Sequence, residues 1–227
     1  MNTIKLVVFD MAGTTVNENN IVYKTVQKVI NDLGYQVSLD AVLEFGAGKE
    51  KHQAITDVLQ NCTHSTAVQE EAATAFAAFK PELEVAYDTQ SIGTFEGMLA
   101  FFKRLKEDTI KVVLNTGYDS KTATKLLAKL EWHVGEEIDM LITADAVENG
   151  RPAPDMIHKA MQQFGITDPS QVLKAGDSQI DIIEGKNAKC GLTIGVLSGA
   201  QTKEQLEAAK PDYILKVITE LEGILLN

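Results

Sequence analysis

Several apolar runs in this chain end in side chains that can take part in chemistry. Asp10, Thr116 and Asp177 each stand at or just after the end of such a run, and Asp181 follows four residues after Asp177. Short apolar runs bounded by turn residues predict strands buried on both faces, as in a parallel sheet. Ligands of open α/β sheets bind beyond the carboxyl ends of the strands, so catalytic side chains are expected at these positions. Taken alone, Asp10 is explained equally well as a cap of the following turn.

The types of these side chains, together with Arg151, indicate phosphoryl transfer. A parallel sheet would bring Asp10, Asp177 and Asp181 to one cleft, where carboxylates repel one another and need a cation. A ligand set made only of oxygen favours Mg²⁺. A carboxylate, a hydroxyl, a guanidinium and Mg²⁺ are the groups that carry phosphoryl transfer through an aspartyl-phosphate. The alternative is that these residues only cap turns and pair at the surface.

Two patterns along the chain predict the elements that position these side chains. Strand and helix patterns alternate over residues 92–227, which predicts a Rossmann-like, doubly wound parallel sheet of the α/β class. Residues 17–91 show helical periodicity and no convincing strand. We therefore expect an α/β core (residues 1–16 and 92–227) with an all-helical cap (residues 17–91) inserted after the first strand. Connections near residues 16 and 93 would be the hinges of cap closure.

Some helix boundaries in this prediction depend on single residues. Gly46 and Gly48 interrupt a helical pattern, and a third helix is expected to begin near Gly48. The Ala- and Glu-rich segment 65–79 predicts a further helix that stops near Pro81, with residues 82–87 continuing only after a break. A closing helix is expected over residues 217–226.

Composition excludes some classes of function. The net charge of −11 disfavours nucleic-acid binding, which needs a basic face, but it leaves an anionic small-molecule substrate open. The sequence has no apolar run of membrane-spanning length and no signal-peptide pattern, so neither a membrane partner nor export is expected. The two cysteines form no disulfide framework. A cytoplasmic location is the resulting expectation.

The order of these motifs resembles the haloacid dehalogenase superfamily over essentially the whole chain. Four segments match its motifs in order: residues 10–14 (DMAGT), 115–117 (NTG), 150–152 (GRP) and 176–181 (GDSQID). Two residues depart from the usual pattern, because Ala12 replaces a second aspartate and Arg151 replaces a lysine. Both departures, and the sequence Thr116-Gly117-Tyr118, are similar to the phosphonoacetaldehyde hydrolase (phosphonatase) branch.

This resemblance implies a role for each matching residue. Asp10 would be the nucleophile, and Thr116 and Arg151 would hold the phosphoryl oxygens, with Gly117 and Tyr118 also binding substrate. The resemblance implies that Mg²⁺ is held by Asp10, the Ala12 carbonyl group and Asp177, supported by Asp181. An arginine can bind a phosphoryl group through two hydrogen bonds, whereas a lysine acts as a point charge.

Ala12 directs attention to the cap, because alanine cannot protonate a leaving group as the usual aspartate does. Phosphonatases avoid this step through a cap lysine that forms an imine with the substrate, and they carry a Gly-x-x-Lys-x-x-His pattern there. Residues 46–52 match it with Lys49 and His52, which would share one face of a helix. The ordinary alternatives are a solvated lysine and a histidine without a catalytic role.

We interpret the sequence as a Mg²⁺-dependent hydrolase of a small phosphonate or phosphate metabolite. The first hypothesis is C–P bond cleavage in a carbonyl phosphonate through an imine on Lys49. The second is a phosphatase of a small phosphate monoester, such as a sugar phosphate or phosphoglycolate, in which His52 or water replaces the missing acid. The third is a non-catalytic protein that binds a phosphorylated ligand. Some relatives pair through their caps, so the resemblance is also compatible with a homodimer.

Overall fold

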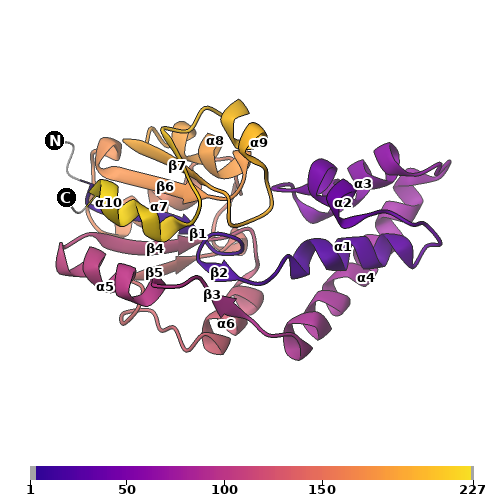
Figure 1. Ribbon diagram of the computed structural model, residues 1–227, viewed down its shortest axis with the longest axis horizontal. Coiled ribbons are helices and arrows are strands. Elements are labelled where there is room, and N and C mark those ends of the chain that lie inside the picture. The colour runs from indigo at the N-terminus through magenta and orange to yellow at the C-terminus, as the bar shows by residue number, and fades with distance from the viewer. Residues whose placement is uncertain (1–3, 226–227) are drawn as a thin grey trace. The chain divides into compact units, whose positions relative to one another are not determined.

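The computed structural model describes residues 4–225. The chain forms two compact units, which we call the core unit (residues up to Glu18 and from Ile92 onward) and the helical unit (Asn19–Ser91). The colours of Figure 1 show that the first strand joins a sheet built otherwise from the second part of the chain.

A six-stranded parallel sheet forms the centre of the core unit, in the order β5-β4-β1-β6-β7-β8. Its strands are β1 (Leu6–Asp10), β4 (Lys111–Asn115), β5 (Met140–Ile142), β6 (Val172–Gly176), β7 (Leu192–Val196) and β8 (Tyr213–Leu215). Every residue of β1 is buried, as expected for a strand covered on both faces. Asp10 pairs with Asn115 on β4, and β6 flanks β1 on the other side. The predicted fold class is confirmed, and the strand order brings the polar strand ends to one edge.

Helices cover both faces of this sheet (Figure 1). They are α5 (Met98–Glu107), α6 (Ser120–Lys129), α7 (Asp155–Gln163), α8 (Gln179–Asn187), α9 (Lys203–Ala208) and α10 (Glu222–Leu225). Alternate residues of β1 contact different helices, because side chains of a strand point to opposite faces. Leu6 and Val8 share an apolar cluster with Met156 of α7, whereas the Phe9 ring stacks on Phe101 of α5.

A short antiparallel ribbon joins the two chain segments that connect the units. It consists of β2 (Val16–Asn17) and β3 (Gly93–Thr94), with Asn17 paired to Gly93. The Thr94 hydroxyl also donates a hydrogen bond to the Thr15 carbonyl group at 2.8 Å. The chain therefore leaves the core unit and returns to it at paired positions.

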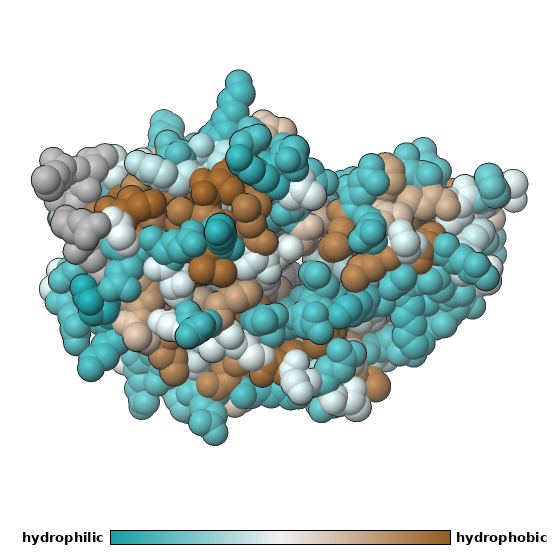
Figure 2. All heavy atoms as spheres, in the orientation of Figure 1, coloured by the Kyte–Doolittle hydropathy of each residue, from teal (hydrophilic) through white to brown (hydrophobic). Residues whose placement is uncertain are grey.

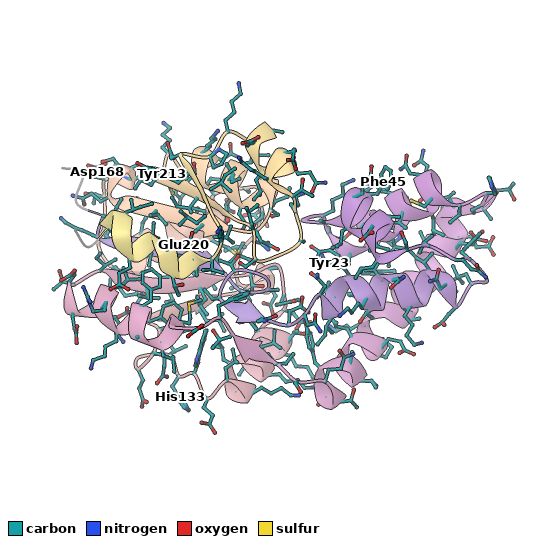
Figure 3. All side chains as sticks on the ribbon, viewed as in Figure 1. Tyr23, Phe45, His133, Asp168, Tyr213 and Glu220 are labelled. Atoms are coloured by element: carbon teal, nitrogen blue, oxygen red, sulfur yellow. The ribbon has the colours of Figure 1, made fainter. Side chains whose placement is uncertain are left out.

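Four helices make up the helical unit: α1 (Ile21–Asn31), α2 (Leu39–Gly46), α3 (Lys51–Cys62) and α4 (Val68–Thr89). All residues of this unit are described, and none lies in a strand. The helices pack through fully buried apolar side chains, among them Val26, Ile30, Val42, Ile55 and Leu59. Figure 3 shows Tyr23 on α1 and Phe45 on α2.

The break expected at Pro81 is wrong, because α4 continues through Pro81 to Thr89. A proline inside a helix costs about 3 kcal/mol, since it removes a hydrogen bond and crowds the preceding turn. Buried side chains recur every four residues on both sides of Pro81, at Phe79, Leu83 and Tyr87. This continuous apolar stripe offsets the cost of the proline.

The closing helix expected over residues 217–226 differs from the structure at its start. A 3₁₀ turn over Ile218–Leu221 precedes α10, and the expected last residue lies outside the described range.

In Figure 2, hydrophilic side chains cover much of the visible face, with apolar groups between them. Within residues 4–225, no helix is long and apolar enough to cross a membrane.

Candidate active site

Three buried carboxylates, which we call the acid cluster, meet at the carboxyl edge of the sheet. Asp10 ends β1, Asp177 follows β6, and Asp181 lies in the first turn of α8. One carboxylate oxygen from each lies within 4.8 Å of the others. Their exposed fractions are 5%, 8% and 1%, so water screens their charges poorly. The structure thus brings together the three aspartates that the sequence singled out.

Glycines allow the backbone to approach these carboxylates closely. Gly13 has a φ of +79°, and a Cβ atom there would lie 2.5 Å from Asp177 Oδ2. A Cβ atom on Gly176 would lie 2.0 Å from the Asp181 carboxyl carbon. Any side chain at either position would displace a member of the acid cluster.

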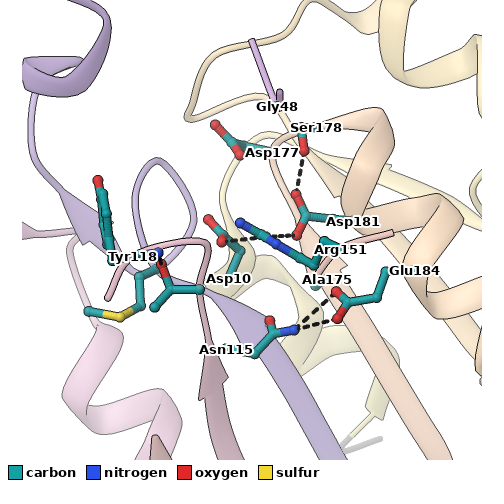
Figure 4. Close-up of polar contacts among 12 residues, drawn as sticks. Asp10, Gly48, Asn115, Tyr118, Arg151, Ala175, Asp177, Ser178, Asp181 and Glu184 are labelled. Atoms are coloured by element: carbon teal, nitrogen blue, oxygen red, sulfur yellow. Dashed lines mark hydrogen bonds and ion pairs between the residues drawn. The ribbon is translucent and has the colours of Figure 1, made fainter. Parts of the chain in front are cut away.

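Arg151 reaches the acid cluster from the loop before α7. Its Nη1 donates to Asp10 Oδ1 at 2.7 Å and to Asp181 Oδ1 at 2.6 Å (Figure 4). Burial opposes the charge of this guanidinium, but the two carboxylates outweigh burial and raise its pKa above the ordinary value. Arg151 therefore stays protonated and holds Asp10 and Asp181 together.

The three carboxylates differ in their tendency to ionise. Burial raises the pKa of Asp10 to about 6, although the charge of Arg151 acts in the opposite direction. Burial, assisted by the charge of Asp10, raises the pKa of Asp177 well above its usual range. Burial also acts on Asp181, but Lys174 and Arg151 outweigh it and lower its pKa to about 2. Asp10 and Asp177 therefore resist ionising together unless a cation relieves their repulsion.

The acid cluster fits a metal ion by both its geometry and its chemistry. Its donors are all oxygen atoms, which hard cations such as Mg²⁺ prefer. Ala12 lies in the turn after β1, where the amides of Thr15 and Val16 donate to the Met11 carbonyl at 2.9 and 2.8 Å. The turn thus fixes the backbone two residues beyond Asp10.

The segment 116–118 follows β4 and lies next to Arg151. Thr116 is buried, and its hydroxyl accepts a hydrogen bond from the Tyr118 amide at 3.2 Å. A Cβ atom on Gly117 would lie 3.1 Å from Arg151 Nη2, so only a hydrogen atom separates this backbone from the guanidinium. The structure therefore joins Thr116, Gly117 and Arg151 in one locality.

Lys49 and His52 lie in the helical unit, and their connection to the acid cluster stays a prediction. Lys49 Nζ forms an ion pair with Asp57 Oδ2. The His52 ring packs edge-on against Phe76, with ring centroids 5.3 Å apart. Tyr23 accepts a hydrogen bond from the Gly48 amide at 3.0 Å, which ties the loop before α3 to α1.

The expectation that Lys49 and His52 share a helical face is wrong, because α3 begins only at Lys51. Gly48 has a φ of +78°, a left-handed backbone conformation that does not occur inside an α-helix. The Glu50 carboxylate then caps α3 by accepting hydrogen bonds from the His52 and Gln53 amides, both at 3.0 Å. Lys49 therefore belongs to the loop and His52 to the first turn of the helix.

The sequence reasoning missed a buried polar group beneath the acid cluster. Lys174 on β6, Asn115 on β4 and Glu184 on α8 are all fully buried. Lys174 Nζ donates to Asn115 Oδ1 and to Asp181 Oδ1, both at 2.8 Å. One signal was available in the sequence, since Lys174 is a charged residue inside an otherwise apolar predicted strand.

The site thus has a buried carboxylate at the end of the central strand β1, a buried hydroxyl after β4 and two buried carboxylates after β6. The family model described as haloacid dehalogenase-like hydrolase matches residues 7–195. The chain therefore belongs to the haloacid dehalogenase-like hydrolase family and is an enzyme of that superfamily, as the sequence motifs predicted.

The names of individual relatives state two different activities. The chain is 29% identical to a phosphonoacetaldehyde hydrolase of Latilactobacillus sakei, over 99% of this chain and 96% of that protein. It is 28% identical to the pyrophosphatase PpaX of Bacillus cereus, over 99% of this chain and 97% of that protein. The structure of a phosphonoacetaldehyde hydrolase-like protein from Oleispira antarctica superposes with a TM-score of 0.82 at 22% identity, covering 98% of this chain and 91% of that one. At this identity, the structural likeness shows the fold alone.

Proposed function

We propose that this protein is a Mg²⁺-dependent hydrolase that cleaves the C–P bond of a small carbonyl phosphonate. The observation that carries the proposal is an acid cluster with a complete nucleophile site but alanine at position 12. The acid cluster supplies Asp10 as the nucleophile, and Arg151 contacts it. Ala12 supplies no proton for an alkoxide leaving group. A reaction whose leaving group needs no such proton is therefore favoured.

Asp10, Asp177 and the Ala12 carbonyl group would hold Mg²⁺, with Asp181 in support. When bound, this cation neutralises carboxylate charge and polarises a phosphoryl oxygen. The raised pKa values of Asp10 and Asp177 support this assignment, because a cation beside them favours their charged forms. Asp10 then carries the charge that a nucleophile needs.

In the proposed reaction, the Asp10 carboxylate attacks phosphorus while Arg151 and Thr116 hold the phosphoryl oxygens. Arg151 exchanges its contact with Asp10 for the substrate and keeps its contact with Asp181. Gly117 leaves room for the guanidinium, because a side chain at this position would obstruct it. Tyr118 would complete the phosphoryl site. Water afterwards hydrolyses the aspartyl-phosphate, which releases phosphate and restores Asp10.

Lys49 provides the path for the electrons of the breaking bond. Its neutral amine condenses with the substrate carbonyl group and releases water, and the resulting imine takes up a proton to become a protonated imine. When the C–P bond breaks, its electron pair moves into this imine and forms an enamine. The enamine then takes up a proton and is hydrolysed to the free carbonyl product, which restores Lys49. His52 would assist the proton transfers.

A second candidate is hydrolysis of a P–O or P–O–P bond in a small phosphate metabolite. It is favoured by the similarity to the pyrophosphatase PpaX, which matches the chain over the same extent as the phosphonoacetaldehyde hydrolase. In this reaction His52 or water would take the place of the missing acid at position 12.

A substrate panel with and without Mg²⁺ distinguishes the two candidates. We expect phosphate release from phosphonoacetaldehyde to exceed release from phosphoglycolate and from pyrophosphate, and to need Mg²⁺. Borohydride should trap an adduct that peptide mapping locates on Lys49. Lys49→Arg should abolish both adduct and turnover, whereas Lys51→Arg serves as the matched control. Full activity of Lys49→Arg without any adduct would exclude the imine.

A further inference from the structure

Lys174 is an unusual residue for the centre of a parallel sheet. Its side chain is 0% exposed, although a buried ammonium costs several kcal/mol unless it is paired. Besides Asn115 and Asp181, Nζ donates to the Ala175 carbonyl at 3.2 Å, and Glu184 Oε2 lies 3.5 Å away. An ammonium has three protons to donate, and three hydrogen bonds use all of them.

The contacts of Lys174 connect the strands on either side of β1. Lys174 lies on β6 and Asn115 on β4, so their hydrogen bond crosses β1 just below Asp10. The Asn115 amide nitrogen donates onward to both carboxylate oxygens of Glu184, at 2.8 and 3.0 Å (Figure 4). Asp10 and Thr116 are thus supported by a fully buried polar network.

Lys174 and Arg151 share one oxygen atom of Asp181. Asp181 Oδ1 accepts from Lys174 at 2.8 Å and from Arg151 at 2.6 Å, while Oδ2 accepts from Ser178 at 2.6 Å. A carboxylate that is already neutralised by Lys174 attracts Arg151 less strongly. Without Lys174, the full charge of Asp181 would compete with a substrate for the guanidinium.

We infer that Lys174 is a positioning residue, which binds Asp181 from below and thereby leaves Arg151 available for a phosphoryl group. The inference rests on the proposed phosphoryl transfer at Asp10, but not on which substrate carries the phosphoryl group. Glu184 and Asn115 hold the ammonium in place. The lysine acts through Asp181 and Arg151, without touching the substrate itself.

The test separates this role from simple charge balance. Lys174→Met alone leaves Glu184 buried without its cation, and its unfolding midpoint should fall. The double variant Lys174→Met/Glu184→Gln removes one charge of each sign, so its net charge is unchanged and the midpoint should recover. Lys186→Met, on the exposed part of α8, is the matched control for loss of a lysine.

Binding of inorganic phosphate at fixed Mg²⁺ is the decisive measurement, made by calorimetry alongside kcat and KM. Loss of one charge-assisted contact predicts a dissociation constant for phosphate raised roughly tenfold in the double variant, with KM raised in parallel. Recovery of phosphate affinity to within about threefold of the natural protein would overturn the proposal, since Lys174 would then only balance charge.

Lys174→Gln provides a second variant if the double variant does not fold, because it keeps a hydrogen-bond donor but removes the charge. The same loss of phosphate affinity is expected, and an unchanged affinity contradicts the inference. If neither variant folds, Lys174 serves stability alone and the inference fails. Phosphate affinity reports on Lys174 even if no phosphonate is hydrolysed, so the two proposals fail independently.

Discussion

Lys49 and Asp57 form an ion pair within the helical unit, although Lys49 lies in the loop before α3 and Asp57 lies inside that helix. The side-chain amide of Gln53 also donates to Asp57 Oδ1, at 2.6 Å. Burial opposes ionisation of Asp57, but these partners outweigh it and lower its pKa. The ion pair engages the Lys49 side-chain nitrogen, whereas attack on a carbonyl group needs a free lone pair on that nitrogen. Under the proposed imine mechanism, Lys49 must lose this partner before it reacts.

Replacement of Asp57 should therefore make imine formation easier. In Asp57→Asn, we expect borohydride trapping of phosphonoacetaldehyde at a fixed neutral pH to be up to about fivefold faster, because partly exposed ion pairs contribute at most about 1 kcal/mol. The rate of adduct formation, followed by mass spectrometry, measures this change. Asp40→Asn, at an exposed position of α2, is the control. An identical rate of adduct formation in all three proteins would contradict the proposed link.

Removing the charge of Asp10 should stabilise the metal-free protein. The pKa of Asp10 is raised from 3.8 to about 6 by burial, so its charged form is unfavourable in the folded state at neutral pH. Asp10→Asn should raise the free energy of unfolding by about 1–3 kcal/mol in urea titrations with chelator, while abolishing turnover. Exposed Asp108→Asn should stay within about 0.5 kcal/mol of the natural protein. A less stable Asp10→Asn would mean that its ion pair with Arg151 outweighs burial.

The stability of the metal-free protein should fall as the pH rises from about 4 to 6. In that interval folded Asp10 still holds a proton that the unfolded chain has released, and Asp177 acts in the same direction. Asp181, with its pKa lowered to about 2, adds stability that is complete above pH 4 and lost only at lower pH. Urea midpoints measured across this range should show the fall. Saturating Mg²⁺ should remove it, and an unchanged fall would argue against binding at the acid cluster.

Restoring a carboxyl group at position 12 should change substrate preference. Ala12→Asp supplies the proton donor that ordinary phosphatases of the family use, and general acid catalysis contributes roughly 10²–10⁴-fold. We expect faster hydrolysis of phosphoglycolate by Ala12→Asp, with little gain for a phosphonate. Ala12→Asn has the same shape without a proton to transfer and is the matched control. Equal rates in the two variants would show that position 12 acts through shape alone.

Two glycines with positive φ allow a direct test of close packing at the acid cluster. Gly34 has a φ of +101° and open space where a Cβ atom would stand, so Gly34→Ala measures backbone strain alone, about 1 kcal/mol. In Gly13→Ala the new atom would collide with Asp177. We expect a larger loss of stability and a Mg²⁺ affinity reduced roughly tenfold, measured by calorimetry. Equal losses of stability, with Mg²⁺ affinity intact, would contradict close packing at this turn.

The position of the acid cluster was predictable because it depends on local patterns. Asp10 ends an apolar run, and parallel pairing necessarily carries such ends to one edge of the sheet. Arg151 was predictable only as a motif residue, since nothing local fixes how its loop approaches Asp10. The contacts of Lys174 were not predictable, because they join β4, β6 and α8 through side chains far apart in sequence.

The predicted helix boundaries were wrong where side-chain contacts opposed the local helix propensity. Lys49 and Glu50 favour a helix by propensity, yet Glu50 acts as the cap of α3, which begins only at Lys51. Pro81 gives a strong local signal against one, yet buried side chains on both sides of it keep α4 intact. In both cases tertiary or capping contacts, worth a few kcal/mol at most, decided between near-equal local alternatives.

The pairing of Asn17 with Gly93 has a consequence for the diversity of such enzymes. The helical unit begins and ends at neighbouring points of the core unit, so its length and helix number do not affect the strand order of the sheet. An entire insert can be exchanged for another without moving Asp10. Evolution, or an engineer, can therefore replace the helical unit while keeping the acid cluster intact.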